Sequence, residues 1–152
     1  MKILTKIFSV LLCLSLASFV FSGCNKDDDG EIANTMTLRG VKYGIAMGIY
    51  FSDGQFTHID VDTSQGDDNL HGYGQFASSM IGKTTPAADA AFDISFNPMS
   101  GPSIDPVIKS GNITIKKVEK GLHIVVDCVE VDGQKFYMDY LAESEADFNA
   151  RQ

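Results

Sequence analysis

The chain has 152 residues, with 20 acidic against 12 basic side chains, a formal net charge of −8 and three cysteines. This length fits a single domain of ordinary size. The acidic balance argues against a nucleic-acid partner, because proteins that bind nucleic acid carry basic patches.

The first 23 residues have the order of a secretory signal peptide. Lys2 and Lys6 give a basic start, an apolar run follows from residue 7 to residue 21, and a small pair, Ser22-Gly23, precedes Cys24. The uninterrupted apolar stretch is shorter than the roughly 20 residues that a membrane span needs. A cleaved signal is therefore favoured over a transmembrane helix or a buried core helix.

The residues around Cys24 resemble the signals of one class of protein. "FSGC", residues 21–24, resembles the lipobox of bacterial lipoproteins, and "NKDDD", residues 25–29, resembles the acidic export tag of surface lipoproteins in the Bacteroidota. The lipobox resemblance implies that the Cys24 thiol carries a diacylglycerol and that Cys24 becomes the first residue after cleavage. The tag resemblance implies an outer-membrane protein exposed on the cell surface, with the membrane as its partner through the lipid.

Cleavage before Cys24 would change both the cysteine count and the charge of the mature chain. Cys13 leaves with the signal and Cys24 carries lipid, so Cys128 has no partner for an intrachain disulfide. We expect Cys128 to be a buried, inert thiol. Loss of Lys2 and Lys6 leaves 10 of the 12 basic residues against 20 acidic ones, a net charge of −10.

The mature chain divides into a tether and one domain. Residues 24–34 are polar, acidic and aperiodic, which predicts a flexible tether between the lipid and the fold. Residues 35–152 are expected to form a single β-rich domain, because their dominant hydrophobic period is two. The alternating segments are "GIAMGIYF" at 44–51, "QFTHIDVD" at 55–62, "FDISFN" at 92–97, and three segments within 112–141 separated by turns at 119–121 and 132–133.

Helix signals are few. Ser144 with Asp147 three residues later is typical of an N-cap and predicts a short C-terminal helix. Residues 76–82 fit either one helical turn or a strand, residues 85–91 are a candidate short helix, and the prolines of 97–111 predict a long loop. We therefore predict an all-β domain of roughly 6–9 mostly antiparallel strands. Its architecture is expected to be an antiparallel β-sandwich or a lipocalin-like, partly closed barrel with a short C-terminal helix.

The pattern of residues 110–143, "SGNITIKKVEKGLHIVVDCVEVDGQKFYMDYLAE", resembles the C-terminal strands of small uncharacterised Bacteroidota lipoproteins. These proteins have β-sandwich or lipocalin-like barrel folds. The resemblance implies the same fold class for this chain and implies no particular activity.

The strongest candidate for chemistry is the stretch "HIDVDTSQGDDNLHG", which begins at His58. In a strand, His58, Asp60 and Asp62 project from one face, about 6.6 Å apart at each step, and Asp67 and Asp68 follow in a glycine-containing loop. Because oxygen-rich loops can hold Ca²⁺, the four aspartates are candidate metal ligands and Ca²⁺ is the candidate cofactor. The spacing does not match an EF-hand. A solvated strand face followed by a polar turn is the competing interpretation, and catalysis by His58 with Asp60 is a third.

A second candidate is the small face formed by Gly44, Ala46 and Gly48. A strand surface stripped of side chains allows something bulky to lie on it. These residues are therefore candidates for lining a cavity that takes an apolar or amphipathic ligand. The competing interpretation is that a core aromatic, such as Phe92 or Phe96, covers them.

Other residues give weaker signals. The sequence holds no HExxH, GxSxG, CxxC or Walker A string. His123 and Asp127 share a strand face, but about 13 Å separates them along a regular strand, which excludes a direct pair. His71 lies among glycines and is expected in a surface loop. Cys128, on an apolar inward face, is expected to have a raised thiol pKa. The absence of tryptophan argues against a carbohydrate platform.

These observations favour a non-enzymatic, lipid-anchored binding module that takes a small-molecule ligand or an outer-membrane protein partner. Two alternatives remain. One is an accessory structural subunit of an outer-membrane assembly, for which exposed strand edges and loops suffice. The other is a metal-dependent hydrolase that uses the acidic stretch. The fold class alone does not choose between them.

Overall fold

The structure is a computed structural model that describes residues 31–64 and 69–152. The predicted signal peptide, Cys24, most of the tether, Asp67 and Asp68 lie outside the described residues. The strands in these ranges are β1 (Thr35–Leu38), β2 (Val41–Ser52), β3 (Phe56–Ser64), β4 (Leu70–Ala77), β5 (Lys83–Pro86), β6 (Phe92–Pro98), β7 (Ile108–Val118), β8 (Gly121–Glu130) and β9 (Lys135–Ser144). The helices are the 3₁₀ turns η3 (Ser78–Met80) and η4 (Ala87–Asp89) and the α-helix α2 (Glu145–Asn149).

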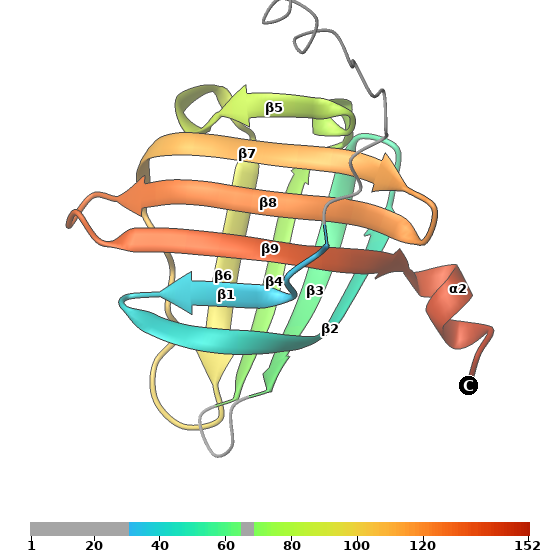
Figure 1. The fold of residues 1–152 in the computed structure, drawn as a ribbon, viewed down its shortest axis with the longest axis horizontal. Coiled ribbons are helices and arrows are strands. Elements are labelled where there is room, and N and C mark those ends of the chain that lie inside the picture. Colours follow the sequence, from blue (N-terminus) through green and yellow to red (C-terminus); the bar gives the residue numbers. More distant parts are fainter. Residues whose placement is uncertain (1–30, 65–68) are drawn as a thin grey trace, which may run out of the picture. The chain divides into compact units, whose positions relative to one another are not determined.

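The described strands form one sheet, in the order β5-β7-β8-β9-β1-β2-β3-β4-β6. The sheet curls on itself into a half-barrel: β7, β8, β9 and β1 form one wall, β3, β4 and β6 form the other, and β2 joins the two (Figure 1). The prediction of an all-β fold with a short C-terminal helix is confirmed. Because all nine strands belong to a single sheet, the architecture is the partly closed barrel rather than the sandwich.

The short strand β1 lies between β2 and β9 and is antiparallel to both. Beyond the start of β1, β2 and β9 meet directly in parallel, with Ile49 opposite Glu143 and Tyr50 opposite Ser144. Asn34 bridges the point where they converge. Its carbonyl oxygen accepts a hydrogen bond from the Ile45 N–H at 2.8 Å, and its Oδ1 accepts one from the Leu141 N–H at 3.1 Å.

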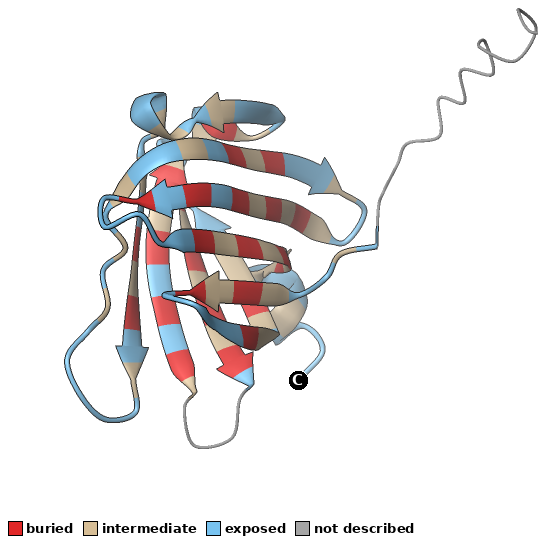
Figure 2. Ribbon diagram, turned by 60° about the vertical axis from the view of Figure 1, so that its left-hand side comes forward, coloured by how far each residue is buried: buried red, intermediate tan, exposed pale blue. Residues whose placement is uncertain are grey.

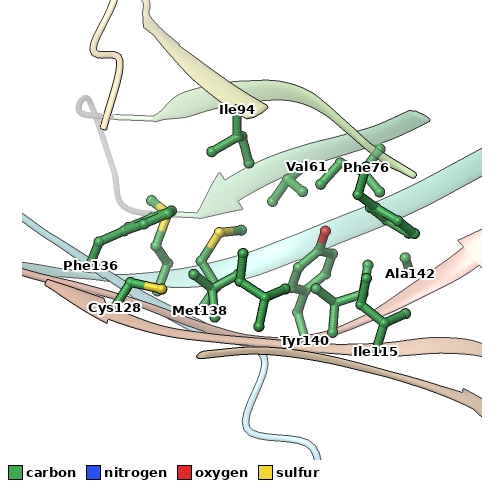
Figure 3. Packing of buried hydrophobic residues seen from close by; sticks show 14 of the residues in the cluster. Val61, Phe76, Ile94, Ile115, Cys128, Phe136, Met138, Tyr140 and Ala142 are labelled. Carbon is green, nitrogen blue, oxygen red and sulfur yellow. The ribbon is translucent and has the colours of Figure 1, made fainter. Parts of the chain in front are cut away.

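The core fills the inside of the curl, where buried residues alternate with outward ones along strands such as β3, β4, β8 and β9 (Figure 2). The predicted inward faces of two strands are confirmed. The inward-facing residues, all 2% exposed or less, are Leu122, Ile124, Val126 and Cys128 of β8 and Phe136, Met138 and Tyr140 of β9. Figure 3 shows the Tyr140 hydroxyl pointing across the core towards Val61 and Phe76. Within the described residues this hydroxyl has no hydrogen-bond partner.

Two local predictions are confirmed. The Asp53-Gly54 turn joins β2 to β3, with Gly54 at a φ of 97° and the Asp53 Oδ1 accepting from the backbone N–H of Phe56 at 2.7 Å. A side-chain acceptor and a residue that tolerates positive φ are what such a turn requires. Ser144 caps the N-terminus of α2, because its Oγ accepts from the Asp147 N–H at 3.1 Å.

Three expectations need correction. Residues 85–91 are not one helix, because β5 continues to Pro86 and only the short turn η4 follows. The proline-rich loop is shorter than predicted, since β6 extends to Pro98 and β7 begins at Ile108. The regular alternation predicted for 44–51 fails at a β-bulge between Ile45 and Met47. A bulge inserts one extra residue, so every side chain beyond it changes face.

Within the described ranges, no helix has the length and apolar content needed to cross a membrane.

A candidate binding face on strands β2, β3 and β4

The predicted faces of β3 are confirmed. Thr57, Ile59 and Val61 are buried, whereas His58, Asp60 and Asp62 point outward. The pairing of β3 with its neighbours places three outward residues of β2 and three of β4 beside them. We call these nine residues the outer face: Met47, Ile49, Phe51, His58, Asp60, Asp62, His71, Tyr73 and Gln75.

Three residues of the outer face converge. Asp62 lies opposite His71 in the β3–β4 ladder, and the His71 Nδ1 is 2.8 Å from the Asp62 Oδ1 and 3.4 Å from the Asp60 Oδ1. One donor atom from each residue lies within 4.8 Å of the other two. An imidazole nitrogen and two carboxylate oxygens at this separation could hold a metal ion.

The surroundings of this cluster shift the pKa values of Asp60 and His71. Burial raises the pKa of Asp60, and the neighbouring Asp62 carboxylate raises it further, while His71 opposes both. The hydrogen bond to Asp62 raises the pKa of His71, and the charge of Asp60 adds to this. The two carboxylates therefore compete for one histidine.

The Asp60 carboxylate is the less well satisfied of the two. Its side chain is 38% exposed, yet its Oδ1 atom is inaccessible to solvent and accepts no hydrogen bond within the described residues. The single proton that the His71 Nδ1 can carry is directed at Asp62. Among residues 31–64 and 69–152, the Asp60 Oδ1 thus has the His71 Nδ1 at 3.4 Å but no hydrogen-bond donor.

A second cluster lies on the same face. The His58 ring is stacked between Phe51 and Tyr73, at centroid distances of 4.6 Å and 6.3 Å. The His58 Nε2 lies 3.4 Å from the Asp53 Oδ2, and its Nδ1 lies 3.2 Å from the Tyr73 hydroxyl. The pKa of Asp53 is lowered, first by the hydrogen bond from the Phe56 N–H and then by His58. His58 is therefore partnered by Asp53 and Tyr73, and the catalytic pairing with Asp60 is not present.

His71 is the residue of this face that the sequence interpretation missed. It lies in β4 and not in a surface loop. The segment "LHGYGQFA" does alternate, with Leu70 and Phe76 inward and His71 and Tyr73 outward, but glycines occupy two of its inward positions and weaken the hydrophobic period. Asp67 and Asp68, also predicted as ligands, lie outside the described residues.

The small face predicted from Gly44, Ala46 and Gly48 is not one face. The bulge at Ala46 leaves Gly44 beside Ser64 on the outside and turns Gly48 towards the core. An added Cβ at Gly48 would lie 2.8 Å from the Tyr140 ring. A core aromatic therefore covers Gly48, and it is Tyr140 rather than Phe92 or Phe96.

A pocket of about 220 Å³ does lie nearby, where β2, β9 and α2 meet. Its lining residues are Asn34, Ile45, Ala46, Met47, Gly48, Leu141, Glu143 and Phe148. Two of the three predicted cavity residues thus line a pocket, although it lies in the wall between strands and not inside the barrel. It is smaller than the ~300–1,000 Å³ typical of sites for drug-sized ligands. Binding there stays a prediction.

The opposite wall holds further titratable groups. The His123 Nε2 lies 2.8 Å from the Asp139 Oδ1 of β9, so His123 pairs across strands and not with Asp127. Cys128 is 1% exposed, and burial raises its pKa to about 11, which keeps it a thiol. Glu130 is 3% exposed, with its Oε1 unpaired within the described residues, and burial raises its pKa.

Comparisons of the chain with protein-family models, with curated proteins and with solved structures found no match. Its function is therefore inferred from the geometry of the outer face.

Proposed function

We propose that this protein is a lipid-anchored outer-membrane protein exposed on the cell surface, and that its β domain is a non-enzymatic binding module. The observation that carries the proposal is the gathering of two histidines, two carboxylates and two exposed aromatic rings on the outer face. Phe51 is 46% and Tyr73 48% exposed. Carboxylates, imidazoles and exposed rings gathered on one rigid sheet face are typical of a binding site.

A rigid β scaffold suits a binding role. The outer face belongs to three adjacent strands joined by continuous ladders, so its side chains need no large rearrangement before contact. Preorganisation of this kind reduces the entropic cost of binding. A small-molecule ligand and an outer-membrane protein partner both fit such a surface.

Binding is favoured over the hydrolase alternative by the state of His58. A hydrolytic site needs a base within reach of the attacking water. His58 is already engaged by Asp53 and Tyr73, and its ring is stacked between two aromatic rings, so it is not free to act as that base.

The anchor is tested by fractionating cells that express the full chain. We expect Cys24→Ser to move the protein from the membrane fraction to the soluble fraction, whereas the matched variant Cys128→Ser stays with the membrane. Membrane association of Cys24→Ser would contradict the lipid anchor.

The binding face is tested by photo-crosslinking in intact cells. The photoreactive analogue p-benzoylphenylalanine replaces Tyr73 in one strain and Tyr137, a half-buried tyrosine of β9 on the opposite wall, in the control. We expect adducts, detected as added mass on the purified protein, from position 73 only. No adduct at position 73, or equal yields at both positions, would contradict a binding role for the outer face.

A further inference from the structure

We propose that Asp60, Asp62 and His71 bind one divalent transition-metal ion of the Zn²⁺ type. The inference rests on the proposed function, since it names a ligand for the same outer face. It also replaces Ca²⁺, the candidate cation from the sequence, with a different class of ion.

The donor distances suit such an ion. Zn²⁺ binds imidazole nitrogen and carboxylate oxygen at about 2.0–2.2 Å, so ligand atoms around a tetrahedral zinc lie roughly 3.3 Å apart. The His71 Nδ1 is already 2.8 Å and 3.4 Å from its two carboxylate neighbours, and all three donors lie within 4.8 Å of one another. The Asp60 and Asp62 side chains are 38% and 40% exposed, so the proposal requires only that their carboxylates rotate towards a common centre.

The arrangement without a cation leaves one group unsatisfied. The carboxylates of Asp60 and Asp62 both lie close to the His71 Nδ1, although like charges repel each other. That nitrogen can donate one hydrogen bond, and it is directed at Asp62. The Asp60 Oδ1 is inaccessible to solvent and has no donor within the described residues. A dication between the three would neutralise both carboxylates and engage the orphaned oxygen.

The types of ligand atom favour one class of metal ion over another. Imidazole nitrogen suits Zn²⁺ and its neighbours, whereas Ca²⁺ takes 6–8 oxygen ligands. Ligation through Nδ1 requires the proton to leave this nitrogen, and the ring keeps its proton on Nε2. Three protein ligands leave at least one coordination position open to solvent, as in zinc sites that bind an external ligand.

The test uses the full-length chain, purified in detergent and stripped of metal. Zn²⁺ is titrated in competition with a chromogenic chelator, and Co²⁺ is added separately to follow its visible absorption. We expect one Zn²⁺ to bind per chain and an equal concentration of Ca²⁺ not to displace it. We also expect bound Co²⁺ to show an intense visible absorption band, which indicates a low coordination number. The Co²⁺ spectrum needs no variant and stands even if a substitution prevents folding.

Variants then locate the ion. Asp62→Asn and His71→Gln should each weaken Zn²⁺ binding at least about 10-fold, since loss of even an outer-shell partner costs that much. The matched control is Asp93→Asn, which removes one negative charge from an exposed position of β6 paired with Gln75 of the outer face. It should leave the affinity within about 2-fold, because an exposed charge without direct ligation contributes little.

Failure of this inference is distinguishable from failure of the proposed function. Absence of Zn²⁺ binding by the unmodified chain, or equal binding by all variants, would overturn the metal site and leave the crosslinking result at Tyr73 intact. Zn²⁺ binding together with no adduct at position 73 would retain the metal site and remove the binding module.

Discussion

Gly48→Ala is expected to destabilise the half-barrel. Gly48 lies where β2 and β9 approach each other, and an added Cβ would be 2.8 Å from the Leu141 carbonyl oxygen and 2.8 Å from the Tyr140 ring. The carbonyl belongs to the β9 backbone and the ring is fully buried, so neither can move away without disturbing the core.

The magnitude follows from two opposing effects. Overpacking of a well-filled core costs about 1–3 kcal/mol, and alanine restricts the unfolded chain, which stabilises the fold by about 0.4–1 kcal/mol. The expected net loss is about 1–2 kcal/mol, which for a domain of this size lowers the melting temperature by roughly 3–10 °C.

Gly44→Ala is the matched control on the same strand. Its added Cβ would lie 3.0 Å from the Ser64 Oγ, an exposed hydroxyl that can rotate away. We expect a change within about 0.5 kcal/mol, as for other surface substitutions. Chemical denaturation of both variants gives the free energies of unfolding. A neutral Gly48→Ala would refute the packing of Tyr140 against Gly48, and would reopen the hypothesis of an empty small face.

Three further predictions concern buried or bridging polar groups. Tyr140→Phe should raise the free energy of unfolding by about 1 kcal/mol, because it removes a buried hydroxyl that lacks a partner in the described part of the chain; a loss of stability in denaturant titrations would show that the hydroxyl is bonded. Burial raises the pKa of Glu130 above its ordinary value, so the folded state holds this proton more tightly than the unfolded state does. The contribution to stability is present below the unfolded-state pKa and is lost as the pH rises through the folded-state pKa. Glu130→Gln should therefore be more stable than the unmodified chain at neutral pH, by about 1–3 kcal/mol, with the difference vanishing in acid; a difference independent of pH would contradict this. Asn34→Ala should cost about 1 kcal/mol in the same titrations, since it removes the side-chain bond to the Leu141 N–H and places alanine at a φ of 47°; an unchanged stability would mean that the bridge is dispensable.

The parts of the fold that could be predicted from the sequence depend on local patterns. The inward alternation of β8 and β9, the Asp53-Gly54 turn and the Ser144 cap each involve residues a few positions apart, so their physical causes are visible in the sequence. The bulge at Ala46 has no such signal. It lies in a Gly/Ala-rich segment where either face could turn inward, and pairing with β3 decides which one does.

The candidate site was predicted only in part for the same reason. Asp60 and Asp62 share a face because they are two residues apart, whereas His71 joins them through the register of β4 on β3. The glycines that obscured β4 are required by its neighbour: a Cβ at Gly72 would lie 2.6 Å from the Phe96 ring of β6. The pairings of His58 with Asp53 and Tyr73, and of His123 with Asp139, likewise depend on cross-strand register.

The most direct test of a metal site on the outer face is anomalous X-ray diffraction at the zinc edge, from crystals of the full chain grown with Zn²⁺. We predict one strong anomalous peak within bonding distance of the Asp60 and Asp62 carboxylates and the His71 Nδ1. A peak beside His58 and Asp53 instead, or no peak on the outer face, would contradict the assignment.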